Sequence, residues 1–204
     1  FGVVGRGVYE ITAKRDDMQV TKVVCLEDIQ LPDATVTRDI NEVLNDETID
    51  TVVEAMGGLH PAYEFVSAAL KAGKHAVSSN KALVAAYYNE LTALARENGV
   101  AFRCTAAVGG GIPLIRPLMQ CLAANEITDI TGILNGTTNY ILTKMLGEGA
   151  AFEDVLKDAQ AKGYAEAIPA ADVEGLDACR KVCILTALAF GSHAYPAMVP
   201  TQGI

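Results

Sequence analysis

The sequence predicts an α/β protein that begins with a Rossmann-like, doubly wound parallel sheet and continues into an α+β domain. The first observation is that short β-rich runs alternate with helical ones over residues 1 to about 110. The second is a pair of well-marked helices: HPAYEFVSAALKAG, with Pro61 in its first turn and Gly73 after its last, and NELTALARENG, which ends at Gly99. Strands that alternate with helices are typical of a parallel sheet. The runs expected as strands are VTKVVCLED, TIDTVVEAMGG, KHAVSSN and VAFRCTAAV.

The chain opens on FGVVGRGVYEI, which fits the last part of a dinucleotide-binding turn. Such a turn has the pattern G-x-G-x-x-G directly after a buried strand, and Gly2 and Gly5 fit its second and third glycines. No residues precede them to form that strand, so we expect a fragment that lacks the first strand of the sheet. The following helix would direct the amides of Gly2, Val3, Val4 and Gly5 at a phosphate. An ordinary turn is the alternative.

Two acidic residues indicate which nucleotide the turn binds. Glu27 and Asp28 end the strand expected over VTKVVCLED. They lie about 20 residues past the glycine turn, the spacing at which an acid binds the ribose 2′-hydroxyl of NAD. No arginine stands beside them in the sequence to bind a 2′-phosphate, so the sequence favours NAD over NADP.

The pattern changes after GGGIPLIRPLMQCLAANE. EITDITGIL is expected as a strand, NGTTNYILTKML and FEDVLKDAQAKG as helices, and DVEGLDACRKVCILTALAFG as one long helix that ends at Gly191. We therefore expect an incomplete nucleotide-binding domain over residues 1–120 and an incomplete substrate-binding and dimerisation domain over 121–204. The boundary would lie on a helix that starts at Pro113.

Composition excludes several classes of partner. The net charge is −9, from 16 Lys and Arg against 25 Asp and Glu, which argues against binding to nucleic acid. The longest apolar run, ILTALAF, is far below the ~20 residues needed to cross a bilayer, and no signal peptide is recognisable, so a cytoplasmic location is expected. The five cysteines form no CxxC pair and are expected to be buried, reduced thiols. A metal pair at Cys179 and Cys183 is the weaker alternative.

The last long helix carries the strongest functional signal. Asp177 and Lys181 are spaced i, i+4 and project from one face. A surface ion pair is the simple alternative, but the rest of the helix is apolar almost all round, and charges on a buried helix are costly unless they are paired or functional. We therefore favour a function for this pair. Asp172 is expected as a helix N-cap, and Glu166 lies in a loop just upstream.

Two further segments place polar groups at the start of a helix. In SSNKALVA, Lys81 follows the carboxyl end of an expected strand, where open α/β sheets bind ligands. A solvated lysine is an equally good interpretation. In ILNGTTNYIL, an amide and two hydroxyls open a helix that is able to hold a carboxylate on its N–H groups, and a well-capped helix explains the same residues.

Taken together, these segments resemble the homoserine dehydrogenase family from Phe1 to about Phe190. The motifs that carry the resemblance are FGVVGRGVYE, VVEAMGG, SSNKALVA, AAVGGGIPLIRPL, GILNGTTNYIL, KGYAE and DVEGLDACRK, in the order of the family. The resemblance implies a reversible interconversion of L-aspartate 4-semialdehyde and L-homoserine with NAD(H) or NADP(H). It also implies a place in threonine, methionine and isoleucine biosynthesis, and a homodimer formed through the sheet of the second domain.

The resemblance also implies roles for individual residues. Lys181 would donate a proton to the aldehyde oxygen, Asp177 would be its partner at the substrate, and Lys81 would lie near the nicotinamide and the substrate. Glu166 would bind the substrate amino group. The other implied contacts are Asp172, Asn135, Gly136 and Thr137 to the substrate, Gly57 and Ser79 to the cofactor, and the carbonyls of Val108, Gly110 and Ile112 to a sodium ion.

This sequence departs from the family pattern in three places. Ile168 stands in EAIP where the family has an aspartate, the first strand and first glycine are absent, and the chain stops at VPTQGI. The chain is therefore expected to be inactive alone. Two other functions remain open: another small-substrate dehydrogenase with a lysine at a strand end, and a nucleotide-binding relative without catalytic activity.

Overall fold

The computed structural model describes residues 1–204, which form two compact units, Phe1–Ala107 and Val108–Ile204. The expected domain boundary at residue 120 lies further along the chain than this division. The reason is that the short π-type helix η2 (Pro117–Cys121) packs against helix α8 (Leu176–Phe190) of the second unit. This η2 helix replaces the longer helix expected from Pro113.

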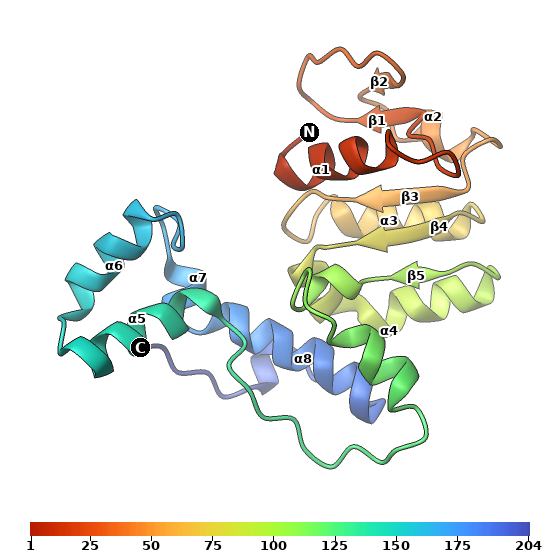
Figure 1. Ribbon diagram of the computed structural model, residues 1–204. Helices are drawn as coiled ribbons and strands as arrows, with labels where there is room; N and C mark the ends of the chain where they lie inside the picture. Colours follow the sequence, from red (N-terminus) through yellow and green to blue (C-terminus); the bar gives the residue numbers. More distant parts are fainter. The chain divides into compact units, whose positions relative to one another are not determined.

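The first unit contains two parallel sheets. Strands β1 (Lys22–Val24) and β2 (Thr35–Thr37) form one, and β3 (Thr51–Glu54), β4 (His75–Ser78) and β5 (Phe102–Arg103) form the other (Figure 1). The α/β class with parallel strands is thus confirmed, and β1, β3, β4 and β5 lie within the four expected runs. The sequence analysis missed β2, which is only three residues long.

Helices lie before, between and after these strands. They are α1 (Val3–Thr12), α2 (Asn41–Leu44), α3 (Ala62–Lys71), α4 (Lys81–Glu97) and the 3₁₀ turn η1 (Thr105–Ala107). Helix α3 ends where Gly73 takes a φ of 74°, a left-handed conformation that suits glycine. Helix α4 starts earlier than expected, because the Asn80 side chain caps it by accepting a hydrogen bond from the Leu83 amide at 3.1 Å.

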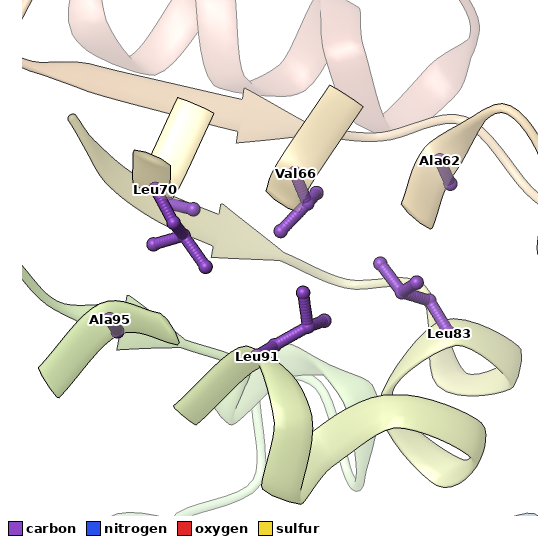
Figure 2. Close-up of a cluster of buried hydrophobic side chains, with 7 residues drawn as sticks. Ala62, Val66, Leu70, Leu83, Leu91 and Ala95 are labelled. Carbon is purple, nitrogen blue, oxygen red and sulfur yellow. The ribbon is translucent and has the colours of Figure 1, made fainter. Parts of the chain in front are cut away.

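The core of the first unit joins helices α3 and α4 to strand β4. Figure 2 shows three side chains of α3 that recur every fourth residue, Ala62, Val66 and Leu70, opposite Leu83, Leu91 and Ala95 of α4. Together with Ala76 of β4, all are at most 3% exposed. This packing fixes α4, and therefore its first residues, against the end of the β3–β4–β5 sheet.

The second unit is helical. It contains α5 (Gly136–Glu148), α6 (Phe152–Ala161), α7 (Ala170–Val173), α8 (Leu176–Phe190) and the 3₁₀ turn η3 (Pro196–Met198). The prediction of a strand over EITDITGIL is wrong for this chain, since these residues belong to no helix or strand. A strand requires hydrogen bonds to a neighbour, and the second unit offers none to these residues.

A glycine corner divides the helix that the sequence predicts as one. Gly175 has a φ of 80° and separates α7 from α8. A Cβ on Gly175 would lie 3.0 Å from Thr201 Cγ2 and 3.1 Å from the carbonyl of Gln202, and a Cβ on Gly203 would overlap the carbonyl of Val173. The Ile204 amide donates to that same carbonyl at 3.0 Å. Residues 201–204 therefore pack directly on the start of α8.

The cysteines are all free thiols, but they are not all buried. Cys104, Cys179 and Cys183 are buried, Cys25 is half-buried and Cys121 is exposed, so the expectation of five buried thiols is wrong for two of them. Burial raises the pKa of Cys104 and that of Cys183 to about 11. No group of three or more His, Cys, Asp or Glu side chains is arranged to hold a metal, and no helix is long and apolar enough to cross a membrane.

We expect Leu70→Ala to lower the free energy of unfolding by about 2–5 kcal/mol, because it leaves a cavity in a fully buried cluster. Urea unfolding followed by circular dichroism measures the change. Leu26→Ala is the matched control, since Leu26 belongs to the same unit and is 83% exposed, and it should shift the free energy by less than about 0.5 kcal/mol. Equal effects of the two variants would contradict the described core.

We expect Gly203→Ala to destabilise the chain by about 1–3 kcal/mol, because the added methyl group has no space beside Val173. Gly147→Ala should do the opposite, since Gly147 lies inside α5 with nothing near its Cβ position and alanine favours a helix by about 0.5–1 kcal/mol. Thermal unfolding of both variants checks the sign of each change. A neutral Gly203→Ala would show that the corner yields to a side chain.

Candidate active site

A buried carboxylate organises the carboxyl ends of strands β3 and β4. Glu54, the last residue of β3, is 4% exposed and accepts hydrogen bonds from Ser78 Oγ at 2.5 Å and from the Met56 amide at 2.7 Å. Asn80 Nδ2 lies 3.5 Å from Glu54 and donates to the carbonyl of Gly58 at 2.7 Å. These bonds tie the two loops at this edge of the sheet to each other.

This network places the candidate residues of the second loop. Lys81 is the first residue of α4 and is half-buried, as is Ser79. Gly57 lies in the opposite loop, with open space at its Cβ position. Glu54 was not predicted from the sequence, although a carboxylate directly after two valines of an expected strand is an unusual pattern that indicates such a residue.

The start of α1 and the end of β1 also come together. Gly2 is the N-cap of α1, and no side chain caps this helix. The amine of Phe1 lies 3.7 Å from Glu27 Oε2, so the glycine turn and the first candidate acid are neighbours. The first amides of a ten-residue helix have no partner within the helix, and a Cβ at Gly2 would meet open space, so this end has groups of the kind that bind an anion.

An arginine stands beside the second acid, contrary to the expectation from the sequence. Arg38 Nη2 lies 2.6 Å from Asp28 Oδ1. The two residues are ten positions apart in the chain, but the parallel pairing of β1 with β2 brings their strand ends together. A cavity of about 490 Å³ lies at these ends and is lined by Glu27, Asp28 and Arg38 among others. The argument that favoured NAD over NADP therefore fails.

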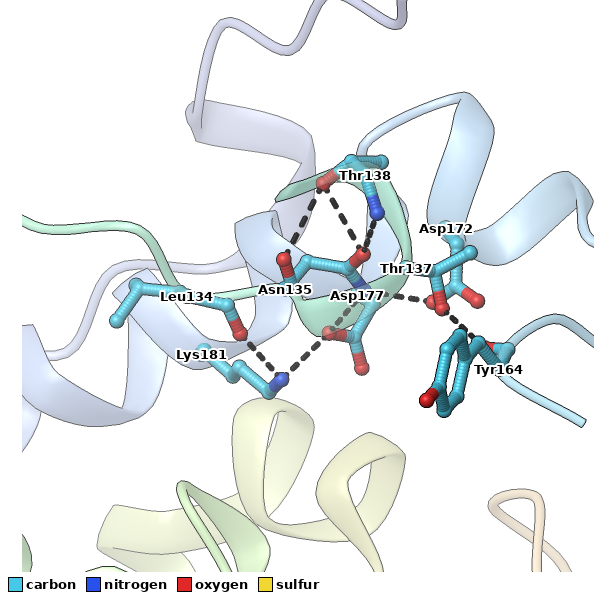
Figure 3. Close-up of polar contacts among 8 residues, drawn as sticks. All are labelled: Leu134, Asn135, Thr137, Thr138, Tyr164, Asp172, Asp177 and Lys181. Carbon is cyan, nitrogen blue, oxygen red and sulfur yellow. Dashed lines mark hydrogen bonds and ion pairs between the residues drawn. The ribbon is translucent and has the colours of Figure 1, made fainter. Parts of the chain in front are cut away.

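In the second unit, Lys181 is held between a carboxylate and a carbonyl. Its Nζ lies 2.6 Å from Asp177 Oδ2 and donates to the carbonyl oxygen of Leu134 at 2.5 Å (Figure 3). The side chains of Lys181 and Asp177 are only 14% and 13% exposed, so this i, i+4 pair is not an ordinary surface ion pair. The positive charge of the lysine is thus fixed at one position.

Asn135 joins the helices around this lysine. Its Nδ2 donates to Asp172 Oδ1 at 2.6 Å and to Asp177 Oδ2 at 3.0 Å, while its Oδ1 accepts from the Thr138 amide at 2.8 Å (Figure 3). One amide therefore caps α5 and also holds carboxylates from α7 and from α8. The cluster of Asp172, Asp177 and Lys181 carries a net charge of −1, which favours a cationic group on a ligand.

The remaining candidates of this unit lie at the edge of the cluster. Thr137 donates to the carbonyl of Tyr164 at 2.7 Å, which ties α5 to the loop after α6. Glu166 lies in that loop, is exposed, and takes no part in the hydrogen bonds of the cluster, and Ile168 is 81% exposed. The prediction of Asp172 as an N-cap is wrong: it lies inside α7, whose N-cap is Pro169, because the chain breaks the helix at Gly175.

The loop after η1 is a tight turn built on two glycines with positive φ angles. Gly109 and Gly111 have φ angles of 63° and 81°, and the Ile112 amide donates to the carbonyl of Gly109 at 2.7 Å. Val108 is buried, while the Ile112 side chain is 66% exposed. Carbonyl oxygens in a tight glycine loop are of the donor type that a hard cation prefers.

We expect Asn135→Asp to lower stability at pH 7 by about 2 kcal/mol, because it replaces a donor with a third carboxylate within hydrogen-bond distance of Asp172 and Asp177. Repulsion raises the pKa of the new group in the folded state, so the loss should be complete at pH 7 and should shrink as the pH falls and the group is protonated.

Unfolding midpoints of Asn135→Asp at pH 7 and pH 4 test this expectation. Asn139→Asp, on the exposed side of the same helix, is the control and should show no such dependence on pH. If Asn135→Asp loses the same stability at pH 7 and at pH 4, then its effect comes from the capping of α5 and not from repulsion between carboxylates.

Two family models match consecutive parts of the chain. The family model described as the NAD binding domain of homoserine dehydrogenase matches residues 1–105, and the model described as homoserine dehydrogenase matches residues 113–204. The homoserine dehydrogenases of Synechocystis and of Bacillus subtilis are 44% and 41% identical to it over all of this chain and 50% of their own length. The chain thus spans about half the length of the curated relatives that it matches.

Solved structures lead to the same family. The homoserine dehydrogenase of S. aureus at pH 7.5 is 37% identical, with a TM-score of 0.86 over 100% of this chain and 51% of its own. A hyperthermophilic archaeal homoserine dehydrogenase in complex with NADPH is 28% identical, with a TM-score of 0.74 over 98% of this chain and 58% of its own. Because two consecutive models of one family cover residues 1–105 and 113–204, the chain belongs to the homoserine dehydrogenase family.

Proposed function

We propose that this chain supplies the nicotinamide-binding and catalytic residues of a homoserine dehydrogenase, which interconverts L-aspartate 4-semialdehyde and L-homoserine. The observation that carries the proposal is the shielded ammonium of Lys181, held at 2.6 Å from Asp177 in the part of the chain that matches the homoserine dehydrogenase model. The reaction would serve the biosynthesis of threonine, methionine and isoleucine.

Lys181 is suited to the proton transfer. When bound, the reduced nicotinamide supplies a hydride to the aldehyde carbon, and negative charge then develops on the aldehyde oxygen. A fixed ammonium stabilises that charge and donates its proton to form the hydroxyl of homoserine. Lys181 regains its proton from solvent, and in the reverse direction it accepts the proton of the hydroxyl. Asp177 keeps the ammonium in one orientation throughout.

The carboxylates around Lys181 are suited to the other end of the substrate. L-Homoserine carries an ammonium group, and the net charge of −1 in the Asp172, Asp177 and Lys181 cluster favours its approach. Glu166, in the exposed loop after α6, would add a third carboxylate for this ammonium. Asn135, Gly136 and Thr137 form the N-terminus of α5 and would receive the substrate carboxylate on their free amides.

The first unit would hold the cofactor. Gly2, Val3, Val4 and Gly5 line the N-terminus of α1 and fit the pyrophosphate, while Glu27 lies beside them for a ribose hydroxyl. Gly57 and Ser79 lie in the loops after β3 and β4, where Glu54 holds the backbone, and Lys81 is the first residue of α4. Lys81 would contact the nicotinamide and the substrate there.

Three further properties stay predictions. The carbonyls of Val108, Gly110 and Ile112 would hold a structural sodium ion, since carbonyl oxygens are the donor type that a hard cation prefers. A homodimer would form through the second unit, and the protein would work in the cytoplasm.

We expect Lys181→Ala to lower kcat by about 10²-fold or more, the range for loss of a general acid, with a smaller change in KM. Oxidation of NADPH or NADH by aspartate semialdehyde, followed by absorbance, measures it on this chain extended to the length of its relatives. Lys144→Ala is the matched control, since it removes another i, i+4 lysine, paired with Glu148 at 2.7 Å on α5. A Lys181→Ala rate within a few-fold of the parent would remove Lys181 from this role.

A further inference from the structure

The loop that carries Glu166 is turned back along the helix that precedes it. Gly163 has a φ of 75° just past the end of α6, a left-handed conformation that suits glycine there. Its amide donates to the carbonyl of Gln160 at 3.0 Å, and the Tyr164 amide donates to that of Ala159 at 2.8 Å. The loop therefore runs beside the last turn of α6, within reach of the side chains of that turn.

Two contacts fix the loop as far as Ala165. Thr137 Oγ1, on α5, donates to the carbonyl of Tyr164 at 2.7 Å (Figure 3). Ala165 is 8% exposed and packs in an apolar cluster with side chains of α5 and α6. Burial thus sets its position, and Glu166, one residue further along, starts from a fixed point.

Beyond Ala165 the loop depends on Gln160. Its Nε2 donates to the carbonyl of Glu166 at 3.1 Å and lies 3.4 Å from the carbonyl of Ala167. The peptide groups of residues 166–168 take part in no hydrogen bond to another backbone group, so the side chain of Gln160 is what holds them. The Glu166 side chain is exposed and has no hydrogen bond or ion pair within the chain. The direction of its carboxylate therefore follows from a backbone that Gln160 holds.

We propose that Gln160 is a positioning residue for substrate binding: its amide directs Glu166 toward the ammonium group that the substrate carries. The inference rests on the proposed function for the identity of that ammonium, and not for the hold on the loop. A primary amide suits this place, since one nitrogen with two hydrogens faces two consecutive carbonyls. A lysine or an arginine would also donate, but its positive charge would compete with the substrate for Glu166.

Gln160→Met tests the kinetic part, because methionine keeps the length and the helix propensity of glutamine and loses both donors. On this chain extended to the length of its relatives, we expect KM for L-homoserine to rise about fivefold, the factor for losing one hydrogen bond, with kcat changed by less than about twofold. Gln120→Met is the matched control, since Gln120 is an exposed glutamine of the same unit, on η2, and it should leave both constants unchanged. Equal changes in the two variants would overturn the inference.

A double-mutant cycle with Glu166→Gln shows whether Gln160 acts through Glu166. Glu166→Gln alone should raise KM about tenfold, because a neutral amide attracts an ammonium group less than a carboxylate does. In the Gln160→Met background it should add only about twofold, since the carboxylate that it replaces is already misdirected. If the two factors multiply, the residues act independently and Gln160 does not position Glu166.

Proteolysis of this chain tests the hold on the loop without turnover. Cleavage after Glu166 by a protease specific for glutamate requires the loop to leave its place, so Gln160→Met should speed that cleavage about fivefold. Cleavage after Glu126, in an exposed segment of the same unit, is the standard within each sample and should not change.

Gln160→Leu, another helix former without donors, replaces Gln160→Met in these tests if the methionine variant does not fold. An unchanged rate of cleavage after Glu166, or an unchanged KM for L-homoserine, overturns the inference. Faster cleavage, together with a parent enzyme that oxidises no L-homoserine, rejects the proposed function and leaves the hold of Gln160 on the loop intact.

Discussion

An asparagine that caps a helix and also contacts a carboxylate is the feature on which the polar sites of both units depend. Asn80 accepts from the Leu83 amide and directs its Nδ2 toward Glu54, and Asn135 accepts from the Thr138 amide and donates to Asp172 and Asp177. In each case one side chain joins the start of a helix to a carboxylate of another element. Serine at either position would still cap the helix but would lose the hydrogen bond to the carboxylate. Capping alone therefore does not explain why an amide side chain stands there.

Elements with their own local signals were predictable. The apolar runs of β1, β3, β4 and β5 and the capped ends of α3 were visible in the sequence, because periodicity and terminal residues act over a few positions. The wrong predictions fall where contacts with residues far away in the sequence determine the secondary structure. The run EITDITGIL has strand composition but no neighbouring strand in its unit, and the expected long helix breaks at Gly175, where residues 201–204 leave no room for a side chain.

In the candidate site, too, local contacts were predictable from the sequence and long-range contacts were not. The spacing of Asp177 and Lys181 predicted a pair on one helix face, which the structure contains at 2.6 Å. The spacing did not predict the hydrogen bond from Lys181 to the Leu134 carbonyl, because that contact joins residues 47 positions apart. The same holds for Arg38, whose position beside Asp28 follows from strand register rather than from its place in the chain.

The reactivity of the half-buried Cys25 thiol would report whether the cavity at the ends of β1 and β2 is occupied. Its Sγ donates to the carbonyl of Glu27 at 3.4 Å, and it lines the same cavity as Arg38. Cys104, Cys179 and Cys183 are buried, and Cys121 is exposed at the end of η2. A nucleotide in the cavity would shield Cys25 from alkylation and leave Cys121 open to it. The ratio of the two labelling rates, read by mass spectrometry of a single sample, would therefore measure occupancy with an internal standard in every molecule.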